Sequence, residues 1–350
     1  MTEYQLKERE KAILRFIIHQ FILTANPVGS RNISKKYNIG LSPASIRNIM
    51  ADLEDLGYLN HPHTSAGRVP TDKGYRVYVD SLMDPPNLES EVKSIVNVNL
   101  SQATTETEDL LKITSTILSN LTNQLALVTY PKFEQAILEK IQIVKLSSIR
   151  ILVIVTVQSG LIRTITLEID ADVNENHLST VQQFLNERLS GLRFSEIRST
   201  FNDRIKDFNS DSVRPIIRVF VESVDRIFTD ISSDKTIISG TKNILSQPEF
   251  EDHEQFQSVI ELIENKDVII HILNKNKNQD IDLSISIGKE NLDEKLSDYS
   301  LITKEYKVGD LKGTLGIMGP KRMDYSKIIA AVVYIAEQLT HELTKQRYEL

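Results

Sequence analysis

Two short helix-like segments, a tight turn and a basic loop follow one another between residues 30 and 78, and together they constrain the fold most strongly. Ser30 is a typical helix start, and Asn38-Ile39-Gly40 predicts a turn soon afterwards. Ser42-Pro43 is typical of a second helix start, because serine can accept a free amide and proline needs no N–H donor there. Gly57 can adopt the left-handed conformation that ends a helix. We therefore predict a helix-turn-helix.

The predicted second helix has one apolar face. Its apolar residues recur at steps of three and four, which predicts one buried stripe made of Ile46, Ile49, Met50, Leu53 and Leu56. Ser45, Arg47 and Asn48 then point elsewhere. In a helix-turn-helix this end of the second helix enters the major groove, where arginine can pair with guanine and asparagine with adenine. The alternative is a solvated helix face.

The segment from Tyr58 to Thr71 has the pattern of a two-stranded ribbon. A Ser65-Ala66-Gly67 turn separates two short extended pieces, and Pro62 and Pro70 exclude both from the centre of a sheet. Arg68 would then lie at the tip, where it could reach a phosphate or the minor groove. This arrangement is typical of a wing, although an ordinary surface hairpin would have the same pattern. Thr71 can cap a further helix with Tyr75, Val79 and Leu82 on its apolar side.

The net charge of −7 hides an uneven distribution. Residues 1–83 hold 11 Lys and Arg against 8 Asp and Glu, a net +3, whereas the other 267 residues hold 30 against 40, a net −10. The basic charge therefore coincides with the predicted helix-turn-helix. Contacts from cations to phosphates are what would position a reading helix on DNA.

Long runs in this region resemble a known family. The runs Ser42 to Leu59 (SPASIRNIMADLEDLGYL) and Pro62 to Asp80 (PHTSAGRVPTDKGYRVYVD) resemble the HrcA family of bacterial heat-inducible transcription repressors. Gly319 to Tyr325 (GPKRMDY) is similar to the segment before that family's last helix, so the resemblance covers nearly the whole chain. One position departs, because Ile49 stands where many members carry an acidic residue.

The resemblance implies a function and its partners. A homodimer would bind double-stranded DNA at an inverted-repeat operator, the CIRCE element upstream of chaperone genes, and block transcription. The chaperonin GroEL would help to keep the repressor active until unfolded proteins occupy it. From the residue types and the resemblance together, the predicted DNA contacts are Lys35, Lys36, Ser42, Ser45, Arg47, Asn48, His63, Thr64, Ser65, Gly67, Arg68, Lys73 and Arg76.

The rest of the chain predicts helices and antiparallel strands. Asp84-Pro85-Pro86 is a stiff break between domains. Two helical stripes follow, one with Val92, Ile95 and Val96 and one that runs from Leu110 to Leu125. Extended runs are expected at Ile141 to Leu146, Ile149 to Val157, Leu161 to Leu167, Thr236 to Gly240, Val268 to Leu273, Ile281 to Ile287, Leu301 to Tyr306 and Gly313 to Met318. Ser159-Gly160 predicts a hairpin turn, and a last helix starts at Asp324.

A mostly helical segment, with stretches at His177 to Leu189 and Pro215 to Ile231, interrupts these strands. We therefore expect an α+β protein. Residues 1–83 would form the winged helix-turn-helix, and residues 172–261 an insertion. In the family resembled, an inserted dimerisation domain splits a GAF-like α/β domain with an antiparallel sheet, which here would comprise residues 84–171 and 262–350.

Several function classes find no support in the sequence. The chain has no cysteine, which excludes disulfides and thiolate chemistry and fits a reducing cytoplasm. No catalytic motif, cofactor motif, metal-ligand pattern, signal peptide or membrane-length apolar run is present. Two alternatives stay open: a small-molecule-responsive winged-helix regulator with a GAF-like sensor, and an enzyme with a DNA-binding head. A lined cavity or a cleft with an acid–base pair would favour these over a dedicated repressor.

Overall fold

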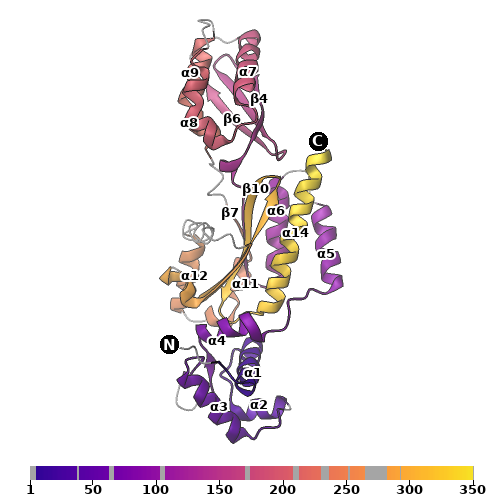
Figure 1. Ribbon diagram of the computed structural model, residues 1–350, viewed down its shortest axis with the longest axis vertical. Helices are drawn as coiled ribbons and strands as arrows, with labels where there is room; N and C mark the ends of the chain where they lie inside the picture. Colours follow the sequence, from indigo (N-terminus) through magenta and orange to yellow (C-terminus); the bar gives the residue numbers. More distant parts are fainter. Residues whose placement is uncertain are drawn as a thin grey trace.

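A computed structural model gives the fold of the chain. It describes residues 5–349 except 38, 63–66, 103–106, 170–173, 208–212, 230–235, 251–252, 265–281 and 292. Three units follow one another along the long axis of the molecule (Figure 1). We call them the head (residues 5–83), the body (residues 84–132 and 236–349) and the insert (residues 133–229).

The head contains helices α1 (Glu8–Thr24), α2 (Ser30–Lys36), α3 (Pro43–Asp55) and α4 (Asp72–Val77), which continues as a π-helical turn (Tyr78–Leu82). The predicted helix signals are confirmed. Ser42 Oγ accepts from the Ser45 amide at 3.1 Å, Thr71 Oγ1 accepts from the Gly74 amide at 3.1 Å, and Gly57 has a φ of 77°. Between α3 and α4, strands β1 (Leu59–Asn60) and β2 (Val69–Pro70) pair antiparallel as the predicted ribbon.

The body is built on one antiparallel sheet in the order β7-β3-β10-β9-β8. Its strands are β3 (Leu125–Thr129), β7 (Thr236–Ser239), β8 (Leu283–Ile287), β9 (Tyr299–Val308) and β10 (Leu311–Pro320). Helices α5 (Ser90–Ser101), α6 (Thr107–Thr122) and α14 (Tyr325–Glu349) lie on one side of it, and α11 (Thr241–Leu245) and α12 (His253–Glu264) on the other (Figure 1). The predicted last helix is confirmed as α14, and its buried residues include Tyr325, Ile328, Ile329, Val332, Ile335, Ala336, Leu339 and Leu343.

Side chains fill the interior of the body around Tyr306. This fully buried ring donates its hydroxyl proton to the Thr129 carbonyl at 2.6 Å. A Cβ atom at Gly313 on the next strand would lie 2.3 Å from the ring, so only glycine fits opposite it. The missing side chain of Gly313 thus permits close packing of the two strands.

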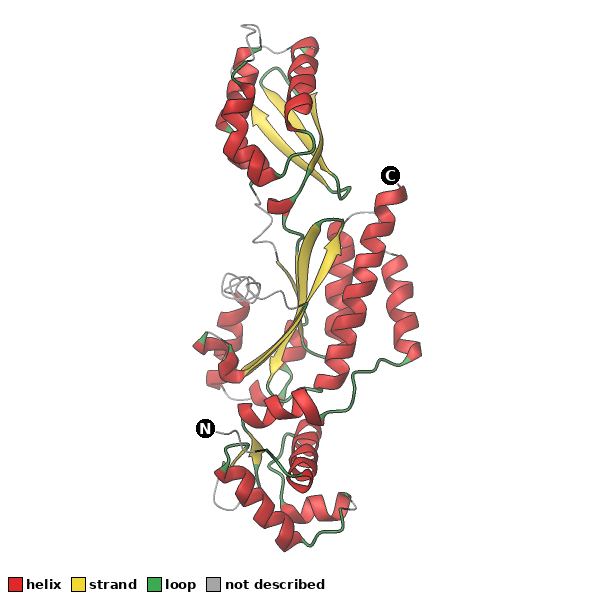
Figure 2. Ribbon diagram, viewed as in Figure 1, coloured by secondary structure: helices red, strands yellow, loops and turns green. Residues whose placement is uncertain are grey.

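The insert has its own sheet and core. Strands β4 (Leu138–Lys145), β5 (Arg150–Val157) and β6 (Ile162–Glu168) pair antiparallel in that order. Helices α7 (Glu175–Leu189), α8 (Phe194–Ile205), α9 (Arg214–Glu222) and α10 (Val224–Phe228) accompany this sheet at the far end of the molecule from the head (Figure 2). The edge strand β4 is closed by side chains of α7. Asn186 accepts from the Ile141 amide at 2.7 Å and donates to its carbonyl at 2.8 Å, and Gln182 accepts from the Ile143 amide at 2.8 Å.

The predicted extent of the insertion is wrong. The strands between residues 138 and 168 pair only with one another in the described part of the chain, so they belong to the insert and not to the body sheet. The insert therefore begins near Phe133, not at residue 172. It ends near Thr229, because β7 pairs with β3 of the body. Alternation of apolar residues predicts a strand but does not identify its partner.

Smaller differences from the sequence predictions concern single elements. Helix α6 ends at Thr122, where Asn123 turns left-handed with a φ of 52°, so Leu125 starts a strand. Ile95 is 56% exposed and does not join Val96 in the core. Helix α8 was not predicted, and a break at Ser223 separates α9 from α10. The expected strand Val268 to Leu273 lies outside the described residues.

Candidate nucleic-acid interface

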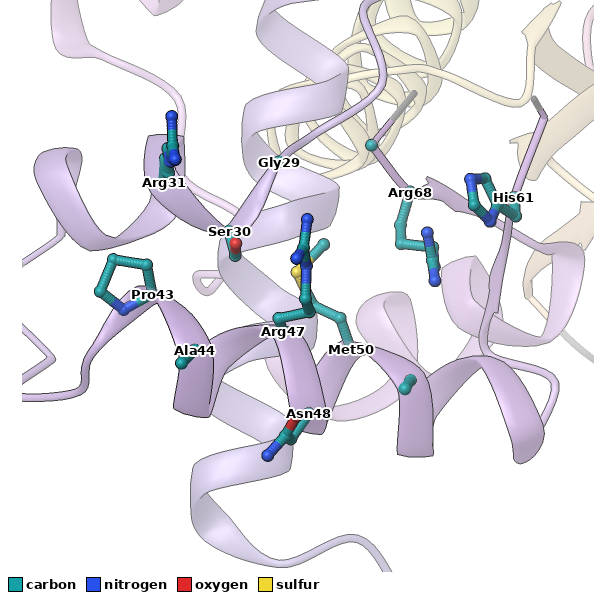
Figure 3. Close-up of a pocket in the computed structure, with 12 residues that line it drawn as sticks. Gly29, Ser30, Arg31, Pro43, Ala44, Arg47, Asn48, Met50, His61 and Arg68 are labelled. Carbon is teal, nitrogen blue, oxygen red and sulfur yellow. The ribbon is translucent and has the colours of Figure 1, made fainter. Parts of the chain in front are cut away.

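An open groove lies on the head between α2, α3 and the ribbon (Figure 3). Its volume is about 1070 Å³, and it is lined by Gly29, Ser30, Arg31, Pro43, Ala44, Arg47, Asn48, Met50, Ala51, His61, Gly67 and Arg68. The buried stripe of α3 holds the helix in place, since Ile46, Met50 and Leu53 are in the core and Ile49 and Leu56 pack against it. The polar side of α3 is therefore turned outward.

Two arginines reach this groove from different helices. Arg47 of α3 and Arg31 of α2 are both exposed, and neither makes a hydrogen bond or ion pair with the described residues. Both cations are free to meet an anion from outside the protein. Arg31 was not among the predicted contacts, although it lies in the same basic segment as Lys35 and Lys36.

Asn48, Ser45 and Ser42 are exposed at the same end of α3. Figure 3 shows that the Arg47 and Asn48 side chains leave the helix in different directions. The Ser42 hydroxyl lies 3.0 Å from the Ser45 hydroxyl and also caps the helix. The Ser42 side chain thus has a structural role as the cap of α3. The side chains of Arg47 and Asn48, by contrast, make no hydrogen bond with the described residues.

The two predicted lysines of α2 lie at its carboxyl end. Lys35 and Lys36 are exposed. Lys36 donates to the Gln20 side chain of α1 at 2.6 Å, while Lys35 has no partner among the described residues. Lysine near the end of a helix also complements the helix dipole.

Arg68 directly precedes β2, on the side of the ribbon where the loop connects the two strands. Its backbone amide and carbonyl pair with those of Val28 at 2.9 Å each. Its guanidinium contacts Glu54 at 2.7 Å and is 19% exposed. A Cβ atom on Gly67 would lie 2.4 Å from the Val28 carbonyl, so this glycine permits the close approach. The predicted contacts His63, Thr64 and Ser65 lie outside the described residues.

Lys73 and Arg76 are engaged within the chain. Lys73 donates to the Leu56 carbonyl at 3.0 Å and lies over the Tyr58 ring. Arg76 faces the body, where its two hydrogen bonds to Glu290 raise its pKa further. To contact phosphate as predicted, Lys73 and Arg76 would therefore have to leave these internal partners.

Two properties of the described residues bear on metals and membranes as partners. No three His, Cys, Asp or Glu side chains come together there as a metal site. None of the described helices has the length and apolar character needed to cross a membrane.

Comparison with known proteins identifies relatives over the full chain. A family model described as the HrcA protein C terminal domain matches residues 108–329. The Heat-inducible transcription repressor HrcA of Chlorobium phaeobacteroides (strain BS1) is 39% identical, with 98% of this chain and 100% of that protein covered. The protein of the same name from Prosthecochloris aestuarii is 39% identical, with 97% and 98% covered.

A solved structure has a similar fold. The crystal structure of a hypothetical protein aligns with 98% of this chain and 100% of its own, with a TM-score of 0.62 and 22% sequence identity. At this identity the likeness concerns the fold alone.

Proposed function

The chain belongs to the HrcA family of heat-inducible transcription repressors, and on that premise we propose that its head is a winged helix-turn-helix that binds operator DNA. The protein is a transcription repressor of heat-shock genes and not an enzyme. We assign α2 and α3 to the helix-turn-helix and the β1–β2 ribbon to the wing. The amino-terminal half of α3 would lie in the major groove.

The observation that carries this proposal is the pair of unpartnered arginines in one groove. Arg31 and Arg47 project from the two helices that would face DNA, and nothing in the described chain neutralises them. By contrast, Glu54 pairs with Arg68 and Glu290 pairs with Arg76. Arg47 and Asn48 are the proposed base-reading residues, while Arg31 and Lys35 are proposed to contact phosphate.

The finer features of the function follow from the family. We propose that two copies bind the two halves of an inverted repeat, the CIRCE element, because two-fold protein symmetry matches a palindrome. We propose that residues of the insert join the copies, that the body is GAF-like, and that GroEL supports the active state. The filled interior around Tyr306 supports a dedicated repressor over a small-molecule sensor.

A gel-shift assay tests the proposal. The inverted-repeat operator and a scrambled duplex are compared with and without GroEL, using the wild type, Arg47→Ala and Asn48→Ala. Loss of one base contact should cost about 1–3 kcal/mol and relax preference at one operator position. Lys242→Ala, which removes an exposed cation of the body, is the matched control. Unchanged operator affinity in both head variants would contradict the reading role.

Arg68 allows a different test. If it leaves Glu54 to meet a phosphate, Arg68→Ala should weaken binding to every sequence alike and lower the salt slope by about one unit. Salt titrations of operator and scrambled duplex measure this directly. A change confined to the operator would instead assign Arg68 to base reading.

A further inference from the structure

The head is docked on the body through α4. Tyr75 of α4 is buried against Tyr325, the first residue of α14, with ring centroids 6.0 Å apart. One continuous cluster of buried apolar residues extends from α1 and α3 of the head to α14 of the body. The two units therefore share a core, even though Asp84-Pro85-Pro86 separates them in the sequence.

Polar contacts surround this apolar floor. Arg76 Nε donates to Glu290 Oε1 at 2.8 Å, and its Nη2 reaches both Glu290 Oε2 and, at 2.8 Å, the Ile285 carbonyl of β8. Glu290 lies in the short 3-10 helix Gly288–Glu290, and its carboxylate also accepts from the Ile287 amide at 2.9 Å. Two hydrogen bonds from one guanidinium group fix the orientation of the carboxylate as well as its distance.

Asp72, at the start of α4, contacts the same 3-10 helix and a second body segment. Its carboxylate lies 3.0 Å from Lys321 Nζ and accepts from the Lys289 amide at 3.0 Å. A Cβ atom on Gly288 would meet this carboxylate at 2.2 Å, so the loop and α4 are in close contact.

Helix α1 is anchored separately. Arg322 donates to the Ile22 carbonyl near the end of α1 at 2.7 Å, and its other amino group lies 3.1 Å from Glu249 Oε2. The head is thus held at two helices, α4 and α1. Two separated attachments prevent rotation about either one.

The contacts continue from α4 to α3. Thr71 Oγ1 donates to the Gly57 carbonyl at 2.7 Å, and Lys73 Nζ donates to the Leu56 carbonyl at 3.0 Å. Both acceptors lie just after α3, which carries Arg47. The direction of α3 relative to the body is therefore set through α4.

We propose that Asp72, Arg76, Glu290, Lys321 and Arg322, which we call the latch, determine which separation of operator half-sites the dimer accepts. This inference rests on the proposed function, since it requires a dimer on an inverted repeat. Charged pairs across an interface fix orientation more than they add affinity. If the body fixes each head, the two reading helices can meet only half-sites at the matching distance and rotation.

A spacing series tests the inference. Operators are made with the half-sites moved apart or together by one, two and about five base pairs, the last being half a helical turn. Wild-type affinity should fall about tenfold or more away from the optimum, whereas Glu290→Lys should lose less than about threefold. Affinity for an isolated half-site should stay within about twofold, because the latch variants keep the reading face intact.

Further variants keep the test decisive. Glu290→Gln keeps the size of the side chain, and Lys321→Gln breaks a different latch contact, so a folding defect in Glu290→Lys would not end the test. Glu261→Gln is the matched control, because Glu261 forms a 3.0 Å ion pair with Lys295 within the body. A latch variant that folds and keeps the wild-type spacing profile overturns the inference. Failure of the wild type to distinguish the inverted repeat from a scrambled duplex would instead refute the proposed function.

The distance between the two heads gives a readout that needs no DNA. The chain has no cysteine, so Asn32→Cys places one thiol for a spin label on the exposed face of α2 in each copy. Pulsed electron paramagnetic resonance should give a narrow head-to-head distance distribution. Adding Glu290→Lys should broaden it, whereas an unchanged width would overturn the inference.

Discussion

The two junctions of the body differ in kind. Between head and body, buried apolar residues form one continuous cluster, reinforced by the latch. The insert has a separate cluster, to which the body contributes Leu311, the first residue of β10. At this second junction the Lys132 amide donates to the Lys312 carbonyl at 3.0 Å. A shared core couples the folding of two units, whereas separate cores allow separate unfolding. The head and body should therefore unfold together, and the insert by itself.

The largest effect is expected from a cavity in the insert. Phe194 is fully buried, with the Phe228 ring 5.2 Å and the Phe133 ring 6.2 Å away. Phe194→Ala should lower the free energy of unfolding of the insert by about 3–5 kcal/mol. Amide hydrogen exchange read by mass spectrometry should show faster exchange between residues 138 and 228. Faster exchange in α1 or α14 as well would contradict separate cores.

Alkaline pH should destabilise the head and body and not the insert. Burial raises the pKa of Tyr78 to about 12, and burial is also the main cause of the raised pKa values of Tyr75, Tyr325 and Tyr306. When the pKa of a tyrosine is higher in the folded than in the unfolded state, its burial contributes fully to the free energy of unfolding below the unfolded-state pKa of about 10. This contribution is lost as the pH rises from that value toward the folded-state pKa. The sequence has no tyrosine between Tyr130 and Tyr299, so the insert lacks this contribution.

The head and body should therefore lose stability above about pH 10, by roughly 1 kcal/mol per buried tyrosine at pH 11 relative to neutral pH. Urea unfolding followed by hydrogen exchange across this pH range measures both units in one sample. Phenolate absorbance should rise together with unfolding of the head and body. A parallel loss in the insert would show that general charge repulsion, and not tyrosine burial, is responsible.

A smaller and sharper comparison uses two rings at the head–body junction. The Tyr325 hydroxyl donates to the Lys321 carbonyl at 2.8 Å and lies 2.7 Å from Ser300 Oγ, whereas the buried Tyr75 hydroxyl has no partner among the described residues. Tyr325→Phe should cost about 1 kcal/mol, while Tyr75→Phe should be neutral or stabilising. Thermal unfolding of the two variants measures the difference. Equal destabilisation would mean that the Tyr75 hydroxyl is satisfied in solution.

Local sequence patterns were sufficient to predict the helices of the head. Ser42, Pro43, Gly57 and Thr71 act through their own backbone neighbours, so the helix starts and ends follow from short-range chemistry. The apolar stripe of α3 likewise follows from periodicity alone. The exposure of Arg47 and Asn48 could therefore be predicted from the spacing of their apolar neighbours.

Partners distant in the sequence could not be predicted in this way. Arg76 has a residue type and position that suit phosphate binding, but its partner Glu290 lies 214 residues further along the chain. The strands from 138 to 168 were recognised as strands, yet whether they joined the body sheet depended on pairings that no local pattern encodes. The strand after Asn123 was missed because its apolar residues continue the helical stripe, although asparagine itself was a signal for a left-handed turn.

The amide side chains on β4 have a consequence for behaviour during heat stress. An open strand edge is a template on which other chains can add, and partly unfolded proteins supply many such chains. Asn186 and Gln182 already occupy the backbone groups of Ile141 and Ile143, so a foreign strand would first have to displace them. At the β4 edge the insert should therefore resist co-aggregation during heat stress, when the target genes of the repressor must be expressed.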